Sequence, residues 1–243
     1  MTTIDELLAD LEGDAPVCQV LVGACWTAVV LEGDPARCGL ASTLHAESHD
    51  AGPLVREAGR LCRYSARELA EWLNSPRILE ASIGMAALNA LLEVDESGCV
   101  ELNAEDLVVA RGSGRRVAIV GHFPFTERVR REAGTCWVLE LNPRPGDLPA
   151  DRAQEVLPQA DVVALTGTSL LNHTFDDLVG LCRPDAFVVL LGASAPLSRV
   201  LLERRVTAVS GTRVVDVAAV LRAVGEGATF RQIPGKRLLT MMR

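Results

Sequence analysis

The sequence predicts an α/β protein in two parts, a smaller α+β domain followed by a parallel, doubly wound Rossmann-like domain. From Val117 onward, short apolar runs alternate with amphipathic stretches, which is typical of such sheets. Before that point, strand-like segments come first and helical segments follow, as in α+β domains. We place the two domains at residues 1–110 and 115–243, joined by the polar, glycine-rich stretch 111–115.

The second half carries the parallel strands. Its apolar runs lack in-and-out alternation, which indicates strands covered on both faces, and the repeated strand–helix order implies right-handed crossovers. Strands are expected at 117–121, 136–141, 160–167, 186–192 and 207–211, with the last run, 236–243, as an added edge strand. Helices are expected at about 124–134, 151–159, 175–183, 196–204 and 216–225. Thr174 and Asp177 have the spacing of a capping box.

The first half has a different order. An amphipathic helix at 3–11 precedes antiparallel strand segments at 17–31 and 38–44, which are separated by the turn 32–35. Helices are expected at about 54–60, 65–73 and 79–93.

Composition and charge disfavour several partner classes. The 243 residues carry a net charge of −8, with acids and bases scattered along the chain, so we expect no nucleic-acid partner. The acidic start lacks the features of a signal peptide, and no apolar run approaches the roughly 18 residues that span a bilayer, so we expect no membrane partner and a cytoplasmic location. Seven cysteines without a CxxC pair are interpreted as reduced thiols, and their spacing disfavours a cysteine-only zinc site.

The loops after the predicted parallel strands are candidates for a ligand site, because open parallel sheets bind ligands beyond the carboxyl ends of their strands. Any strand-to-helix turn also needs glycine and small polar residues, but five such loops at one edge favour a site. The candidate ligand-binding residues are Gly121, His122, Phe123, Glu140, Asn142, Thr166, Gly167, Thr168, Gly192 and Ser194.

The first of these loops departs from the GxGxxG fingerprint, since bulky residues replace its second and third glycines, so ordinary NAD binding is disfavoured. Glu140 follows Gly121 by 140 − 121 = 19 positions, about where a ribose-binding acid stands in nucleotide-binding domains. A nucleoside-type cofactor such as S-adenosylmethionine therefore stays open. A solvated acid at a strand end is the equal alternative.

Two clusters in the first half are also candidates. His45, Glu47 and His49 lie within five residues, and imidazole with carboxylate suits a divalent transition metal such as zinc, nickel, cobalt or iron. His122 is the third metal-ligand candidate, and a solvated polar loop is the alternative for 45–49. Glu80 and Asn89 lie in a small-residue helix that we expect to be buried, so they are either structural ties or site residues.

The chain resembles the heavy-metal-chelation domain family. Segments 23–29, 39–44, 51–54 and 80–92 resemble its N-terminal domain, and segments 121–125, 140–145, 166–172 and 191–196 resemble its C-terminal domain. The resemblance covers nearly the whole chain and implies an enolase-N-terminal-like domain packed on a Rossmann-like domain, with a cleft between them. It also suggests links to cobalamin or metal-cofactor metabolism. Ala195 stands where relatives often carry a hydroxyl residue, which puts a polar contact there in doubt.

Two functions follow from these observations. The first is a small-ligand-binding protein whose interdomain cleft chelates a heavy metal or metal complex through His45, His49 and His122, supported by Glu80 and Asn142. The alternative is an enzyme that uses S-adenosylmethionine or a similar cofactor on a small molecule, with Glu140 holding the ribose. No catalytic residue is assigned, and a homodimer is kept open.

Overall fold

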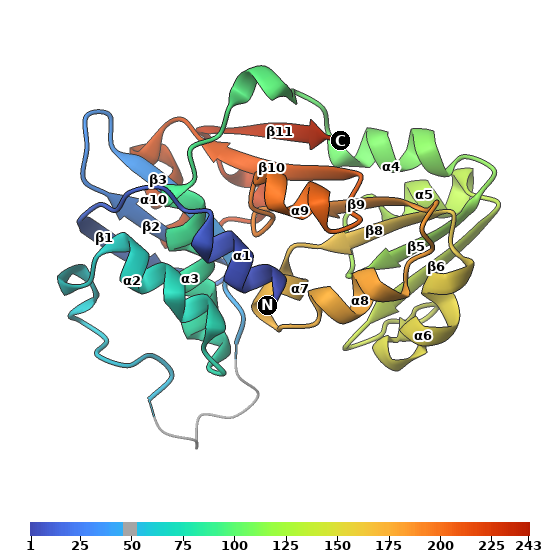
Figure 1. Ribbon diagram of the computed structural model, residues 1–243, viewed down its shortest axis with the longest axis horizontal. Helices are drawn as coiled ribbons and strands as arrows, with labels where there is room; N and C mark the ends of the chain where they lie inside the picture. The colour runs from blue at the N-terminus through green and yellow to red at the C-terminus, as the bar shows by residue number, and fades with distance from the viewer. Residues whose placement is uncertain (46–52) are drawn as a thin grey trace.

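The structure, a computed structural model, describes residues 1–45 and 53–243. It contains a small antiparallel sheet and a large, mostly parallel sheet (Figure 1). The small sheet has the order β1-β2-β3, with β1 Val17–Val22, β2 Trp26–Leu31 and β3 Arg37–Ser42. The predicted strand segment 17–31 is therefore two strands, because the chain reverses at Gly23, whose N–H donates to the carbonyl oxygen of Trp26 at 2.9 Å.

Of the helices of the first part, α3 Ile78–Leu91 packs against one face of the small sheet. The helix α2 Ala66–Ala70 packs on α3, and α1 Thr3–Ala9 contacts the 3-10 extension of α2, Glu71–Asn74. Helix α3 approaches β3 closely because Gly39 has no side chain: a Cβ there would lie 2.1 Å from the carbonyl oxygen of Ala86.

The helix predicted at 54–60 is wrong. Residues 54–59 form bends and turns, and a short 3-10 helix, Leu61–Arg63, follows. Glu57 and Gly59 have φ angles of 51° and 87°, and this left-handed backbone cannot continue a right-handed helix.

The large sheet confirms the five predicted parallel strands, which are β5 Arg116–Val120, β6 Thr135–Glu140, β8 Val162–Thr166, β9 Phe187–Leu191 and β10 Ala208–Val214. It adds a short parallel strand that was not predicted, β7 Leu148–Pro149, beside β6. Their spatial order, β7-β6-β5-β8-β9-β10, is the doubly wound order in which the chain first proceeds to one side of β5 and then returns to the other. The run predicted as an edge strand, β11 Lys236–Met242, instead lies between β10 and the short β4, Cys99–Val100, and is antiparallel to both.

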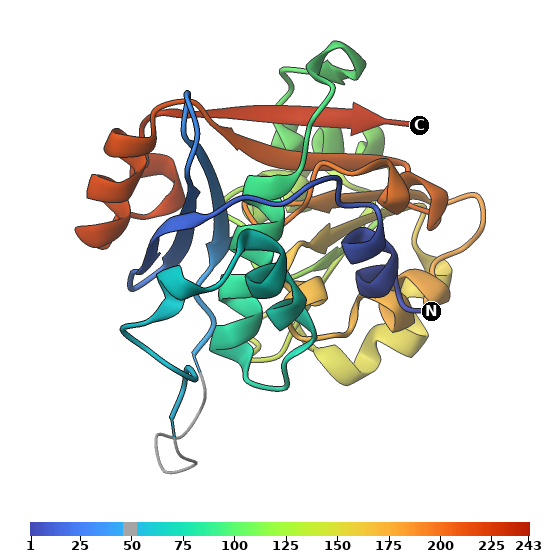
Figure 2. The same cartoon turned by 60° about the vertical axis from the view of Figure 1, so that its left-hand side comes forward.

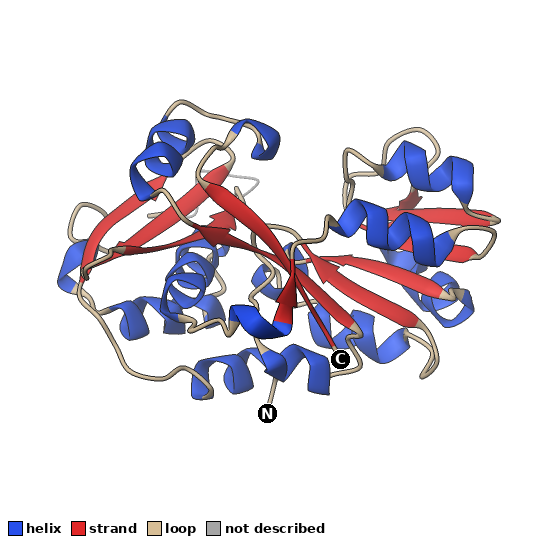
Figure 3. Ribbon diagram, turned by 90° about the horizontal axis from the view of Figure 1, so that it is seen from above, coloured by secondary structure: helices blue, strands red, loops and turns tan. Residues whose placement is uncertain are grey.

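Helices cover both faces of the large sheet (Figure 3). They are α4 Ala104–Gly112, α5 Thr126–Glu132, α6 Ala153–Val156, α7 Thr168–Leu171, α8 Phe175–Leu181 and α9 Arg199–Glu203. The last helix, α10 Val217–Gly225, contacts β1 and β2 of the small sheet instead, and 3-10 turns lie at Glu96–Gly98, Ala150–Arg152, Leu157–Gln159 and Phe230–Gln232. The predicted capping box at α8 is not formed, since the Thr174 hydroxyl donates to Asn172 Oδ1 at 2.7 Å instead of capping the helix.

Helix α10 connects the two sheets. It lies on the face of the small sheet opposite α3 (Figure 2), and Val220 and Val224 form one core cluster with Val30 and Leu40. A Cβ at Gly23 would lie 2.4 Å from the carbonyl oxygen of Val224, so the contact is tight. The small sheet is thus buried between a helix of the first half and a helix of the second.

The domain division at 111–115 and the enolase-like description of the first part stay predictions. Helix α4, which ends at Gly112, contacts α5, β8 and β9. Among the helices of the described residues, none is both long and apolar enough to cross a membrane.

Candidate functional site

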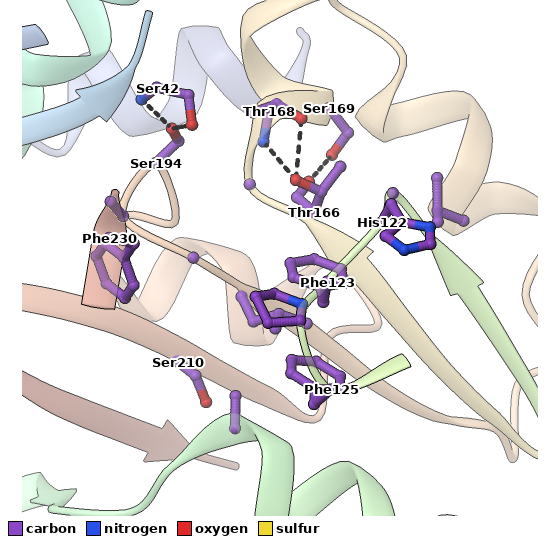
Figure 4. A pocket seen from close by; sticks show the side chains of 18 of the residues that line it. Ser42, His122, Phe123, Phe125, Thr166, Thr168, Ser169, Ser194, Ser210 and Phe230 are labelled. Atoms are coloured by element: carbon purple, nitrogen blue, oxygen red, sulfur yellow. Dashed lines mark hydrogen bonds between the residues drawn. The ribbon is translucent and has the colours of Figure 1, made fainter. Parts of the chain in front are cut away.

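A large cavity lies where the carboxyl ends of the parallel strands meet the small sheet. Its volume is about 1050 Å³, and its wall combines the loops after β5, β6, β8 and β9 with part of β10 and with Trp26 and Ser42 of the small sheet (Figure 4). In the sheet, β5 lies between β6 and β8. The chain passes from β5 to β6 on one side and later returns to β8 on the other side. Crossovers that diverge in this way leave a crevice at the carboxyl ends of the two strands.

The cavity brings together most of the loop residues predicted from the sequence, because parallel strands end at one edge of the sheet. Those that line it are Gly121, His122, Phe123, Glu140, Thr166, Gly167, Thr168, Gly192 and Ser194. Asn142 is exposed and does not line it. Nor does His45, which is exposed and has its Nε2 3.0 Å from the carbonyl oxygen of Ala24. His49 lies outside the described residues.

Glycine is required at three of the loops for steric reasons. Gly121 and Gly192 have φ angles of 101° and 115°, which favour glycine. A Cβ at Gly167 would lie 2.6 Å from the backbone nitrogen of Ala195, so the loops after β8 and β9 are in backbone contact. These glycines therefore shape the cavity wall.

Three hydroxyl groups at the junction of β8 and α7 form hydrogen bonds within this segment. Thr166 Oγ1 and Thr168 Oγ1 are 2.9 Å apart, and the Ser169 hydroxyl donates to the carbonyl oxygen of Thr166 at 2.7 Å. Figure 4 shows these three side chains close together, where β8 ends and α7 begins. These hydrogen bonds fix the orientation of the three side chains in the wall.

The loop after β9 is tied to the small sheet. The backbone N–H of Ser42 donates to Ser194 Oγ at 2.8 Å, and Asn89 Nδ2 donates to the carbonyl oxygens of Leu40 (2.8 Å) and Ala193 (3.2 Å). Asn89 does not line the cavity. Its contacts favour the structural interpretation, in which it fixes the position of the loop that carries Ser194.

Glu80 has a similar structural environment. Its side chain is fully buried and accepts hydrogen bonds from the backbone N–H of Arg56 (2.8 Å), the Ser75 hydroxyl (2.6 Å) and Arg77 Nη1 (3.2 Å). Burial alone raises the pKa of Glu80, but the hydrogen bonds from Ser75 and Arg56 and the charge of Arg56 outweigh it, so the pKa is lowered. Glu80 does not line the cavity.

His122 is paired with a buried carboxylate. Its Nδ1 is 3.4 Å from Asp147 Oδ2, and Arg130 Nη2 donates to the other oxygen of Asp147 at 2.7 Å. Burial raises the pKa of Asp147, but the backbone N–H of Arg144, the hydrogen bond from Arg130 and the neighbouring imidazole lower it overall. The carboxylate therefore stays ionised beside the ring.

The donors needed for a bare metal ion are not gathered in the described residues. Within 1–45 and 53–243, no group of three or more His, Cys, Asp or Glu side chains is placed to hold a metal. All seven cysteines are described and free, and burial raises the pKa of Cys136 and Cys182 to about 11, so both stay protonated. The predicted metal set His45, His49 and His122 stays a prediction.

The wall has an aromatic part, of which sequence reasoning found Phe123 but missed Trp26 and Phe230 as site residues. Phe123 and Phe125 stack with centroids 5.1 Å apart, and Trp26 lies beside Phe230 at 5.3 Å. Thr212 of β10 belongs to the same wall. No spacing links Trp26 to Phe230, which stand 230 − 26 = 204 positions apart, so only the fold could bring them together.

Three comparisons place the chain among known proteins. A model of the DUF364 family, described as "Putative heavy-metal chelation", matches residues 103–243, and a model with the same description, DUF4213, matches residues 4–92. The curated Uncharacterized protein MJ0500 of Methanocaldococcus jannaschii is 27% identical over 224 residues, which cover 87% of this chain and 83% of that protein.

Two solved structures of DUF364-family proteins of unknown function share the fold. The one from Desulfitobacterium hafniense has a TM-score of 0.84 and 24% identity, over 99% of this chain and 97% of the other. The one from Pyrococcus horikoshii also has a TM-score of 0.84, at 20% identity, over 99% of this chain and 98% of the other. Since the DUF364 model alone spans more than half of the sequence, this chain belongs to the DUF364 family, whose description is "Putative heavy-metal chelation".

Proposed function

We propose that this protein binds a small organic molecule, or a metal ion carried in an organic complex, in the cavity between its two halves. The observation that carries the proposal is the cavity itself. A volume of about 1050 Å³ at the carboxyl ends of a doubly wound sheet, lined by Phe123, Phe125, Trp26 and Phe230 with a few ordered hydroxyls, suits an organic ligand.

The metal would come with most of its own ligands. Transition metals bind several nitrogen, oxygen or sulfur donors, and His122 is the one histidine among the described residues that line the cavity. A proton on Nδ1, on the side of the ring that faces the Asp147 carboxylate at 3.4 Å, would leave Nε2 with a lone pair for a metal. His122 would then supply one coordination bond to a metal complex. The family description supports this interpretation.

The test compares bare ions with complexed ions. Thermal unfolding is measured with Ni²⁺ or Co²⁺ alone, with 1,10-phenanthroline alone, and with their 1:1 complexes, which are flat, apolar and have open coordination positions. A complex at about 100 times its Kd should stabilise the fold by about 2.7 kcal/mol and raise Tm by roughly 5–10 °C, more than either component. His122→Gln should remove the part of the shift that depends on the metal. If no complex and no chelator raises Tm, the proposal is wrong.

Glu140 favours a second candidate, a nucleoside-type cofactor such as S-adenosylmethionine. Glu140 lines the cavity at the end of β6, the neighbour of the first strand in the doubly wound order, where a carboxylate holds ribose hydroxyls in nucleotide-binding domains. Glu140→Gln should weaken binding of S-adenosylmethionine or adenosine about tenfold by calorimetry, since the ribose loses an ionised acceptor. The matched control is Glu132→Gln on the exposed end of α5. Equal affinities for both variants and the wild type would remove this candidate.

A further inference from the structure

Three buried side-chain polar atoms lack a hydrogen-bond partner in the described part of the chain: Trp26 Nε1, His122 Nδ1 and Thr212 Oγ1. Buried polar groups in folded proteins are nearly always paired, so each exception calls for a reason. All three belong to residues that line the one cavity of about 1050 Å³. His122 Nδ1 has the Asp147 carboxylate at 3.4 Å, whereas Trp26 and Thr212 have no such neighbour among the described residues.

Trp26 and Thr212 come from other elements than His122: Thr212 is on β10, three strands away from β5, whose loop carries His122. Trp26 begins β2, and its ring is 5.3 Å from that of Phe230 with an interplanar angle of 48°. Phe230 comes from the connection between α10 and β11, and Thr212 of β10 is paired across the strands with Leu238 of β11, which also lines the cavity. Figure 4 shows Phe230 at the opposite side of the view from His122.

The charges of this region are already paired or directed elsewhere. Lys236 Nζ lies 4.8 Å from the centroid of Phe230 and donates to the carbonyl oxygen of Ile233. At the rim, Arg231 and Glu105 approach each other at 3.9 Å. A neutral ligand therefore fits here better than a charged one, because it needs no counter-ion from the protein.

We infer that Trp26, Phe230 and Thr212 form a second subsite, which binds a neutral planar heteroaromatic group that carries a carboxamide or an equivalent acceptor–donor pair. The aromatic rings offer faces and edges for a planar ring. The indole N–H, which can only donate, would meet the carbonyl oxygen, and the Thr212 hydroxyl would accept from the amide N–H₂.

The size of the cavity supports two subsites. Ligand pockets usually measure about 300–1,000 Å³ for one drug-sized molecule, and this cavity is at the upper end of that range. The inference rests on the proposed function, since it assumes that the cavity takes a small molecule. It adds the class of the second ligand, or of the second part of a larger one.

Indole resonances provide a direct test. The chain has three tryptophans, so a ¹H–¹⁵N spectrum contains three indole N–H signals, and the one absent in Trp26→Phe belongs to Trp26. Titration with nicotinamide should move that signal downfield as the N–H gains an acceptor, and leave those of Trp72 and Trp137 in place. Cyclohexanecarboxamide, which has the amide but no planar ring, should bind at least tenfold more weakly.

Matched variants separate the hydrogen bonds from packing. Thr212→Val keeps the shape but removes the hydroxyl, and should weaken nicotinamide binding about tenfold, whereas Thr212→Ser should stay within threefold of the wild type. Trp26→Phe should weaken binding at least tenfold, as measured by calorimetry. Near-native melting temperatures of Thr212→Val and Thr212→Ser establish that both variants are folded.

The outcomes also separate this inference from the proposed function. A Trp26 signal that does not move at high nicotinamide concentration, or equal affinities for Thr212→Val and the wild type, overturns the subsite. If metal complexes or S-adenosylmethionine still stabilise the protein in that case, the proposed function stands without it. If the Trp26 signal moves while none of those ligands raises Tm, the subsite is supported and the ligand class proposed for the His122 and Glu140 side is wrong.

Discussion

The surroundings of Glu80 and the cavity wall both contain buried polar atoms, but they differ in whether these atoms have hydrogen-bond partners within the protein. Around Glu80, a backbone N–H, a hydroxyl and two guanidinium groups all reach the carboxylate. Around the cavity, Trp26 Nε1 and Thr212 Oγ1 have no partner among the described residues. The partners around Glu80 stabilise the fold, whereas the two unpaired atoms are the ones for which we infer a ligand as partner.

The two regions also differ in how their backbones pack. Under the small sheet, Gly39 and Gly84 let helices approach other backbone segments directly. In the cavity loops, Gly121 and Gly192 allow left-handed turns that leave space. Substitutions in the packing around Glu80 and Gly84 should therefore change the free energy of unfolding and leave ligand affinity as it is. Substitutions in the cavity loops should mainly change ligand affinity.

The largest effect on stability is expected from Gly84→Ala. A Cβ at this position would lie 2.2 Å from the backbone nitrogen of Leu73, and backbone cannot rotate away as a flexible side chain can. We expect a loss of about 3 kcal/mol or more in the free energy of unfolding, measured by urea denaturation. A loss below about 1 kcal/mol would show that α3 shifts at little cost and would weaken the comparison.

Glu80→Gln should cost about 2 kcal/mol, because donors arranged for a carboxylate lose an ionised acceptor. Tm should fall by roughly 4–8 °C, and affinity for cavity ligands should not change. Ligand binding that is lost together with stability would show that Glu80 is coupled to the cavity.

The free energy of unfolding of the wild type and of Glu80→Gln should also depend differently on pH. The folded-state pKa of Glu80 lies below its ordinary value of 4.5. Its contribution is therefore fully present above that pH, and is lost as the pH falls through the lowered pKa and the carboxylate takes up a proton. Between pH 6 and pH 3 the wild type should lose more stability than Glu80→Gln, as followed by denaturation at each pH. Parallel losses would contradict the assignment.

Ser194→Ala should have a smaller effect on stability, about 1 kcal/mol, because the backbone N–H of Ser42 loses its acceptor. Since Ser194 also lines the cavity, the variant shows whether a cavity residue can contribute to stability as well. Ser194→Thr, which keeps a hydroxyl, is the control in the same unfolding experiment. An unchanged stability for Ser194→Ala would mean that Asn89 alone fixes the loop.

The smallest effect is expected from Gly180→Ala in α8, where a Cβ would meet nothing within 4 Å. Alanine favours the helix, so stability should rise by about 0.5–1 kcal/mol in the same urea assay. It is the matched control for Gly84→Ala, the same substitution in a helix without a close backbone neighbour. Destabilisation here would show that Gly→Ala substitutions are costly in this protein for reasons other than contact.

The sequence predicted much of the large sheet and of one side of the cavity. Apolar runs such as 117–121 and 186–192 marked the strands, and the loops that contain Gly121, Thr166 and Gly192 followed from where parallel strands end. It did not predict the turns at 54–59, because a left-handed backbone is uncommon at a residue with a side chain such as Glu57, and no turn signal in the sequence marks that position.

The sequence by itself determined that Glu80 is buried and that several polar loops share one edge of a sheet, because hydrophobic patterning and strand direction are local properties. Only the tertiary structure decided that Glu80 has its partners away from the cavity, that Trp26 packs beside Phe230, and that Thr212 lines the same cavity as this pair. Partners far apart in the chain are selected by packing between helices and sheets, which no local spacing encodes.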